Sequence, residues 1–379
     1  MAAAEAATPG GLDAAALPGS TRARSAVAAA AWLWGTAVLS AGAFAVAVAL
    51  APPASASPAR GLGWVLFVAS SGHVAATGWF YGSREVRAHA ARHPWRYARV
   101  PLLLVLGGAA VAAVLPPRAM TWLLLPYFAW QFFHFQKQNL GLASLAAATC
   151  GAPSLTRAER RAVVAAGCTG IAGLLSRPAL LQVAVDSRLG AVFPSAGLAF
   201  GIAAAAGLTL FLRRPSAARP AGLAVTYVTA LAFFLPVFTF TSPYAAVGGL
   251  TIAHGAQYLL LMSHVAGGGE HSSAGAAADA RIARALRLTV LAIIVLLGGA
   301  ALEVASHLHD GDWSLRLLYG MYLGVVMAHF VIDAGLWRLR DPFPRQFLAS
   351  RTPYLLPSTM DRQGAAFHDA RPGPPPARR

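Results

Sequence analysis

Long apolar runs separated by short polar segments dominate the sequence. A helix that crosses a hydrocarbon core about 30 Å thick needs roughly 20 apolar residues. By that criterion the pattern predicts ten membrane-spanning helices, at residues 27–50, 62–82, 98–115, 119–139, 162–177, 189–211, 221–240, 244–265, 287–305 and 317–338. The fifth run is short and rich in glycine, and we expect the fourth helix to continue toward Cys150.

The arginines give an independent test of this topology, because cytoplasmic loops of membrane proteins carry an excess of basic residues. With the N-terminus inside, 24 arginines fall in inside segments and only 5 in outside segments. The outside arginines are Arg60, Arg118, Arg177, Arg188 and Arg316. A missed or invented span would invert every later loop. The asymmetry therefore favours ten spans with both termini in the cytoplasm.

The composition excludes an ordinary soluble domain. Hydrophobic residues make up 57% of the chain and charged residues 12%, against about 25% charged residues in soluble domains. We therefore expect an all-α fold, a polytopic integral membrane helix bundle. The net charge of +16 follows from the arginines that face the anionic cytoplasmic leaflet, so no nucleic-acid partner is expected. The Ala- and Arg-rich, Lys-poor composition is typical of a bacterial cytoplasmic membrane protein.

Three parts follow along the chain. We expect residues 1–24 to be a disordered cytoplasmic tail, residues 25–340 to form the transmembrane helical bundle, and residues 341–379 to be a basic, Pro-rich cytoplasmic tail. The two cysteines, Cys150 and Cys168, form no recognisable disulfide framework or cysteine metal motif.

Histidines enter four of the predicted spans. His73 lies in 62–82, His134 in 119–139, and His329 in 317–338; both His254 and His264 lie in 244–265. All four spans run from outside to inside in the predicted topology, and their histidines lie at the midplane or in the cytoplasmic half. Polar groups at this depth lose hydration that hydrocarbon cannot replace. We therefore expect these side chains to converge inside the bundle.

Helical periodicity gives each of these spans one polar side, since residues at i, i+3, i+4 and i+7 share a face. The residues that share such sides are Gln131, His134 and Gln138; Tyr322, His329 and Asp333; His73, Thr77 and Tyr81; and Gln257 with His264, from which His254 is slightly offset. Packing with these polar sides turned inward is the arrangement that a lipid environment favours.

A metal site is the sharpest interpretation of this pattern, because neutral imidazole is the commonest protein ligand for transition metals. The candidate metal ligands are His73, His134, His254, His264 and His329. Asp333 is a candidate ligand or catalytic group, and Gln131, Gln138, Gln257 and Tyr258 are expected to orient the ligands. Histidine ligands without cysteine favour a non-haem mono- or di-iron centre, with copper or a bis-histidine haem as alternatives.

Lys137 is the only lysine in the chain and follows His134 by three residues. Its ammonium group either extends to the headgroups at the cytoplasmic end of the helix or turns inward, to pair with Asp333 or to hold an anionic substrate group. With Asp333 it is a candidate catalytic residue, placed at the rim of the site.

The combination of many spans, histidines inside the helices and few cysteines resembles the bacterial Brp/Blh carotene dioxygenases and other polytopic, histidine-ligated iron oxygenases. The resemblance covers only the short helical segments around these histidines and transfers no ligand assignment. It implies a membrane-embedded oxidase or oxygenase that acts on a lipophilic small molecule. An electron-donor protein is a possible partner of such an enzyme. The alternatives are a transporter with a relay of His134, Lys137 and Asp333, a haem-binding membrane protein, a scaffold without activity, or histidines that serve packing alone.

Overall fold

The computed structural model describes residues 18–52, 60–185, 188–268 and 277–356, and it contains only helices in those ranges. The all-α prediction is thus confirmed. The larger parts of the predicted tails, residues 1–17 and 357–379, lie outside the described residues.

In the first half of the chain, a single helical segment runs from residue 60 to 82 and changes its winding on the way. The elements are α1 (Pro18–Ala49), α2 (Arg60–Phe67), the π-helical turn η1 (Val68–Gly72), α3 (His73–Ala76), the 3₁₀ helix η2 (Thr77–Gly82), α4 (Arg84–Arg92), the π-helical turn η3 (Trp95–Arg99), α5 (Val100–Val114), α6 (Pro117–Thr149) and α7 (Arg157–Leu175).

In the second half, short 3₁₀ and π-helical pieces again alternate with longer helices. The elements are η4 (Pro178–Leu181), η5 (Arg188–Val192), α8 (Phe193–Leu212), η6 (Ser216–Ala218), α9 (Ala221–Ala232), α10 (Leu235–Thr239), η7 (Tyr244–Gly248), α11 (Gly249–Gly267), α12 (Ala277–Ile293), η9 (Ile294–Gly298), α13 (Gly299–Ser306), α14 (Trp313–Leu336) and α15 (Pro342–Arg351).

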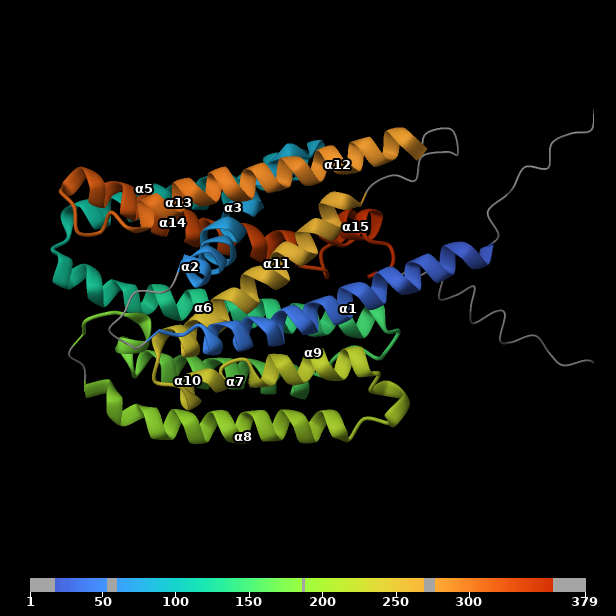
Figure 1. The fold of residues 1–379 in the computed structure, drawn as a ribbon, viewed down its shortest axis with the longest axis horizontal. Coiled ribbons are helices and arrows are strands. Elements are labelled where there is room, and N and C mark those ends of the chain that lie inside the picture. The colour runs from blue at the N-terminus through green and yellow to red at the C-terminus, as the bar shows by residue number, and fades with distance from the viewer. Residues whose placement is uncertain (1–17, 53–59, 186–187, 269–276, 357–379) are drawn as a thin grey trace, which may run out of the picture.

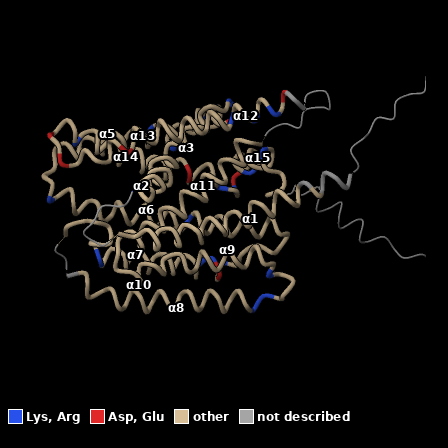
Figure 2. The backbone as a smooth tube through the Cα atoms, viewed as in Figure 1, with Lys and Arg blue, Asp and Glu red and all other residues tan. Residues whose placement is uncertain are grey.

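The long helices lie roughly along one axis and form an elongated bundle (Figure 1). Helices α8 and α12 form its opposite edges in this view, and α11 runs obliquely between them. The start of α1 and the short helix α15 lie at the same end of the bundle. Most of the helical length carries no charged residue, and basic residues gather at the end that holds α15 (Figure 2).

Among the described residues, six helices are long and apolar enough to cross a membrane: Ser25–Ala49, Trp95–Val114, Leu189–Leu212, Tyr244–Gly267, Asp279–Ser306 and Trp313–Leu336. The protein thus has the character of a multi-pass membrane protein. The other four predicted spans are helical but do not reach this standard, and 221–240 is divided into α9 and α10. Pro236 stands at the start of α10 and lacks the N–H that a continuous helix needs. The count of ten stays a prediction.

The surface of these helices is apolar over long stretches. Large exposed side chains include Leu102, Leu103 and Leu106 on α5 and Leu198 and Ile202 on α8. Soluble monomers rarely expose continuous apolar patches of this extent. Contact with lipid acyl chains would account for this exposure.

Helical structure reaches into both predicted tails. Helix α1 begins at Pro18, ahead of residue 25. Helix α15 begins directly after Asp341, where Pro342 occupies the first turn without needing an N–H donor. Phe347 and Leu348 of α15 are buried against the bundle, and this burial explains why the start of the Pro-rich segment is ordered.

Glycines let several helices approach closely around the centre of the bundle. A Cβ atom at Gly108 of α5 or at Gly320 of α14 would overlap the backbone of the other helix. Gly299 lies in the same way against Gly72, and Gly255 of α11 against the carbonyl of Ala69. Small residues at such contacts are the usual means of packing membrane helices, and here they fix the elements that carry the histidines.

An ion pair ties the start of α7 to the end of α8. Thr156 and Glu159 form a capping box at the first turn of α7, and the Glu159 carboxylate accepts two hydrogen bonds of 2.6 Å from the Arg214 guanidinium. Burial acts to raise the pKa of Glu159, but the hydrogen bonds from Arg214 and Thr156 outweigh it and hold the pKa below its ordinary value. Glu159 is thus ionised at neutral pH.

Candidate metal centre

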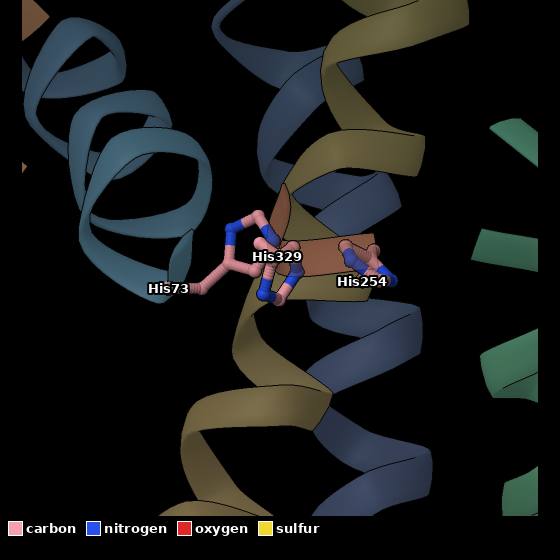
Figure 3. A group of neighbouring side chains, drawn as sticks. All are labelled: His73, His254 and His329. Atoms are coloured by element: carbon pink, nitrogen blue, oxygen red, sulfur yellow. The ribbon is translucent and has the colours of Figure 1, made fainter. Parts of the chain in front are cut away.

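Four histidines from four helical segments meet at the centre of the bundle. They are His73 of α3, His134 of α6, His254 of α11 and His329 of α14. Their ring centroids form a closed circuit with separations of 4.8 Å (His73 to His254), 5.1 Å (His254 to His134), 5.1 Å (His134 to His329) and 5.0 Å (His329 to His73). Figure 3 shows three of these rings reaching toward one another from separate elements.

Two groups of ligand atoms in this cluster have the spacing of a metal site. Single ligand atoms of His73, His254 and His329 lie within 4.8 Å of one another, and the same holds for His134, His329 and Asp333. The first three rings are 3%, 0% and 2% exposed, whereas His134 is half-buried. Either group could hold a metal ion.

The imidazole nitrogens of this cluster are largely without partners. Among the described residues, no hydrogen bond reaches either ring nitrogen of His73 or His254, or Nε2 of His134 or His329. The carbonyls of Ala69 and Ser70 lie near the His73 ring without forming a hydrogen bond. Buried polar groups are almost always paired. These nitrogens are exceptions, because no side chain or backbone group of the described residues forms a hydrogen bond with them.

Local structure orients the rings. His73 directly follows the π-helical turn η1, a departure from α-helical winding that is frequent at functional sites. The ring of Phe135 stacks on His254 at 3.8 Å, and that of Phe330 stacks on His134 at 4.6 Å. The small Gly255 lets α11 approach η1, which brings His254 to His73.

A hydrogen-bonded group of side chains lies behind His329. Thr77 Oγ1 is 2.6 Å from His329 Nδ1 and 2.8 Å from the Tyr258 hydroxyl. Tyr258 in turn donates to Asp333 Oδ1 at 3.1 Å. All four side chains are buried.

Glutamines support the other side of the centre. Gln138 Nε2 donates to the backbone carbonyl of His254 at 2.9 Å and to Gln257 Oε1 at 3.0 Å. Gln257 then donates to Ser40 Oγ at 2.8 Å. The buried Gln131 Oε1 has no partner among the described residues. Gln138 and Gln257 thus tie α6, α11 and α1 together beside His254.

The structure does not bring every candidate to this centre. His264 Nδ1 lies 2.6 Å from the Tyr354 hydroxyl, ten residues farther along α11 than His254, or about 15 Å at 1.5 Å per residue. Lys137 is exposed, and no ion pair joins it to Asp333 in the part of the chain that the structure describes. His264 is thus remote from the four converging rings, and Lys137 is not Asp333's partner.

Several residues next to the centre are not among the candidate site residues predicted from the sequence. Thr77 lies four residues after His73 and bonds to His329, and the stacking rings Phe135 and Phe330 directly follow a histidine. Two residues before His73, Ser71 donates a 2.6 Å hydrogen bond to Glu303. The periodicity placed Thr77 on the polar side of its helix, but no pattern in one chain signals a contact between two helices.

Comparison with protein-family models, with curated proteins and with solved structures found no match.

Proposed function

We propose that the four converging histidines bind iron and that the protein is a membrane-embedded oxidase or oxygenase of a lipophilic small molecule. One observation carries this proposal: His73, His134, His254 and His329 hold six ring nitrogens that are buried and without partners among the described residues. Leaving a buried polar group unpaired costs about 1–3 kcal/mol. A metal ion accounts for this arrangement, whereas histidines that serve packing alone would be expected to hydrogen-bond across the helices.

The ligand chemistry favours iron over the alternatives. Neutral imidazoles suit iron, copper and zinc, and the nearest acidic group is Asp333, behind His329. Ring centroids about 5 Å apart leave no room for a flat porphyrin between neighbouring histidines of the circuit, which disfavours haem on those pairs. The resemblance to histidine-ligated membrane oxygenases favours iron over copper.

The surroundings of His134 support a substrate that arrives from the bilayer. His134 is the half-buried member of the cluster, and its neighbours Trp130 and Phe133 on α6 are each 37% exposed. The open side of the centre therefore faces an apolar, aromatic surface. The bound metal would supply activation of oxygen, and the protein would supply the ligands, their orientation and the exclusion of water. The proposed reaction also uses a partner protein that donates electrons.

A proton relay through Lys137 and Asp333, as in a transporter, has less support. The relay needs Lys137 to face inward, but its side chain is exposed. The Asp333 carboxylate instead accepts hydrogen bonds from Tyr258 and Thr77.

Metal analysis of the detergent-purified full chain tests the proposal. We expect close to one iron per chain, or two for a dinuclear centre, with an optical spectrum that lacks haem bands. His134→Ala and His254→Ala should each lose the metal, while His93→Ala, which removes an exposed histidine of the α4–η3 turn, should retain it. Wild-type protein without near-stoichiometric iron after expression in iron-replete medium would refute the proposal.

A further inference from the structure

We infer that Thr77 is a positioning residue of the metal centre. Its hydroxyl connects the carboxyl group of Asp333 to His329 through hydrogen bonds and holds the proton of that imidazole on Nδ1. Asp333 then acts on His329 through Thr77 and is not itself a metal ligand. The inference rests on the proposed metal centre and extends it to a residue with no assigned role.

The distances place Thr77 between the two groups. Thr77 Oγ1 lies 2.6 Å from His329 Nδ1 and 3.4 Å from Asp333 Oδ1. The direct separation of His329 Nδ1 from Asp333 Oδ2 is 3.6 Å, which is too long for a hydrogen bond. The threonine hydroxyl is therefore the connection between the carboxylate and the ring.

The chemistry of the donors sets the direction of each bond. Each of the two hydroxyls carries one proton and can both donate and accept a hydrogen bond. Tyr258 donates its only proton to Asp333 Oδ1, so its oxygen accepts from Thr77 Oγ1 at 2.8 Å. Asp333 Oδ1, at 3.4 Å, is a more distant second acceptor of the same Thr77 proton. The Thr77 oxygen is then left to accept, and the group that faces it is His329 Nδ1.

This direction determines which nitrogen of His329 can bind a metal. With the proton on Nδ1, the lone pair lies on Nε2, the nitrogen that has no partner among the described residues. With the opposite direction, Nε2 would carry a proton and could not coordinate. Histidine ligands commonly use the second ring nitrogen in this way to hold their orientation.

The same network argues against Asp333 as a ligand, although its carboxylate belongs to a group with metal-like spacing. Its Oδ1 already accepts from Tyr258 and Thr77. A metal bound to Asp333 through Oδ1 would have to displace these buried hydroxyls.

Threonine variants in the full-length, detergent-purified protein test the inference. Thr77→Val keeps the shape of the side chain and removes the hydroxyl, whereas Thr77→Ser keeps the hydroxyl. We expect Thr77→Val to weaken iron binding, measured by competition with a chelator, by roughly 10–100-fold, and to shift the ligand-field spectrum of the Co²⁺-loaded protein. Thr77→Ser should keep the iron affinity and the Co²⁺ spectrum of the wild type. Thr226→Val is the matched control, because within the described part of the chain the Thr226 hydroxyl bonds only to a carbonyl of its own helix.

A purely structural role for Thr77 predicts lower stability of Thr77→Val with an unchanged Co²⁺ spectrum, and that result would overturn the inference. If Thr77→Val does not fold, Asp333→Asn provides the same test: a shifted affinity with an unchanged number of ligands supports the inference, and loss of one ligand from the spectrum overturns it. Wild-type protein that binds no metal would refute the proposed function itself, and the inference with it. Wild-type protein that binds metal as tightly as Thr77→Val refutes the inference alone.

Discussion

Replacing Gly255 with alanine should move apart two of the proposed metal ligands, His73 and His254, without changing either side chain. Gly255 follows His254 on α11 and packs against the backbone of Ala69 in the turn that precedes His73. The added Cβ would overlap the Ala69 carbonyl oxygen and would lie only 2.6 Å from the Ala69 carbonyl carbon and Cα. These are backbone atoms, so no side-chain rotation relieves the overlap. The two segments must move apart.

The expected size of the effect follows from the tolerance of a metal site. Overpacking of this kind costs about 1–3 kcal/mol, and a displacement of roughly 1 Å exceeds the precision within which a ligand set must be held. We therefore expect Gly255→Ala to lower the unfolding temperature and to lose most of the bound iron, both measured on the detergent-purified protein.

Gly141→Ala is the matched control for this experiment. Gly141 lies within α6, and a Cβ at its position meets nothing within 4 Å. Alanine is favoured over glycine inside a helix by up to about 1 kcal/mol, so this variant should keep its iron and lose no stability. A Gly255→Ala protein with full iron content and wild-type stability would refute the argument that close backbone approach sets the geometry of the centre.

Three further variants test other parts of the structure. Arg214→Met should cost about 3 kcal/mol at neutral pH, because it leaves the buried Glu159 carboxylate unpaired. The pKa of Glu159 in the folded protein lies below its ordinary 4.5, so the ion pair stabilises the fold above that pH and ceases to do so as the pH falls through the folded-state pKa. The loss of unfolding free energy caused by Arg214→Met should therefore be smaller in acid than at neutral pH. An equal loss in acid and at neutral pH would contradict this. His264→Ala should retain the iron of the wild type in metal analysis, and loss of iron would return His264 to the ligand set. Gln257→Leu should destabilise the protein by about 1–3 kcal/mol in thermal unfolding, because it strips Gln138 of an acceptor, and adding Gln138→Leu should recover part of that loss; a double variant less stable than the single one would speak against this.

The sequence was informative about which helices carry polar groups, because periodicity on one helix is a local property. It placed His73, His134, His254 and His329 at similar depth on segments of equal direction, and the structure brings these four together. His264 shows the limit of that reasoning. It shares a helical side with Gln257, but the rise of the helix carries it away from the centre to Tyr354.

Contacts between helices were beyond the reach of a single sequence. The role of Thr77 depends on the approach of η2 to α14, and that of Gly255 on the approach of α11 to η1. The π-helical turn before His73 also shifts the register of the polar side, and no residue pattern predicted it. Composition and charge predict the number and orientation of membrane crossings, whereas side-chain pairing depends on tertiary packing.

The burial of His73, His254 and His329 has a kinetic consequence. A metal ion held among these rings would have no aqueous path on three sides, since only His134 is half-buried. Its release would then require the helices to part, an opening that costs a large share of the local stability. Exchange with free ions should accordingly be slow compared with ordinary ligand dissociation. The identity of the bound metal would therefore be decided while the helices assemble in the cell. Purified protein would still contain the metal that was bound at that stage.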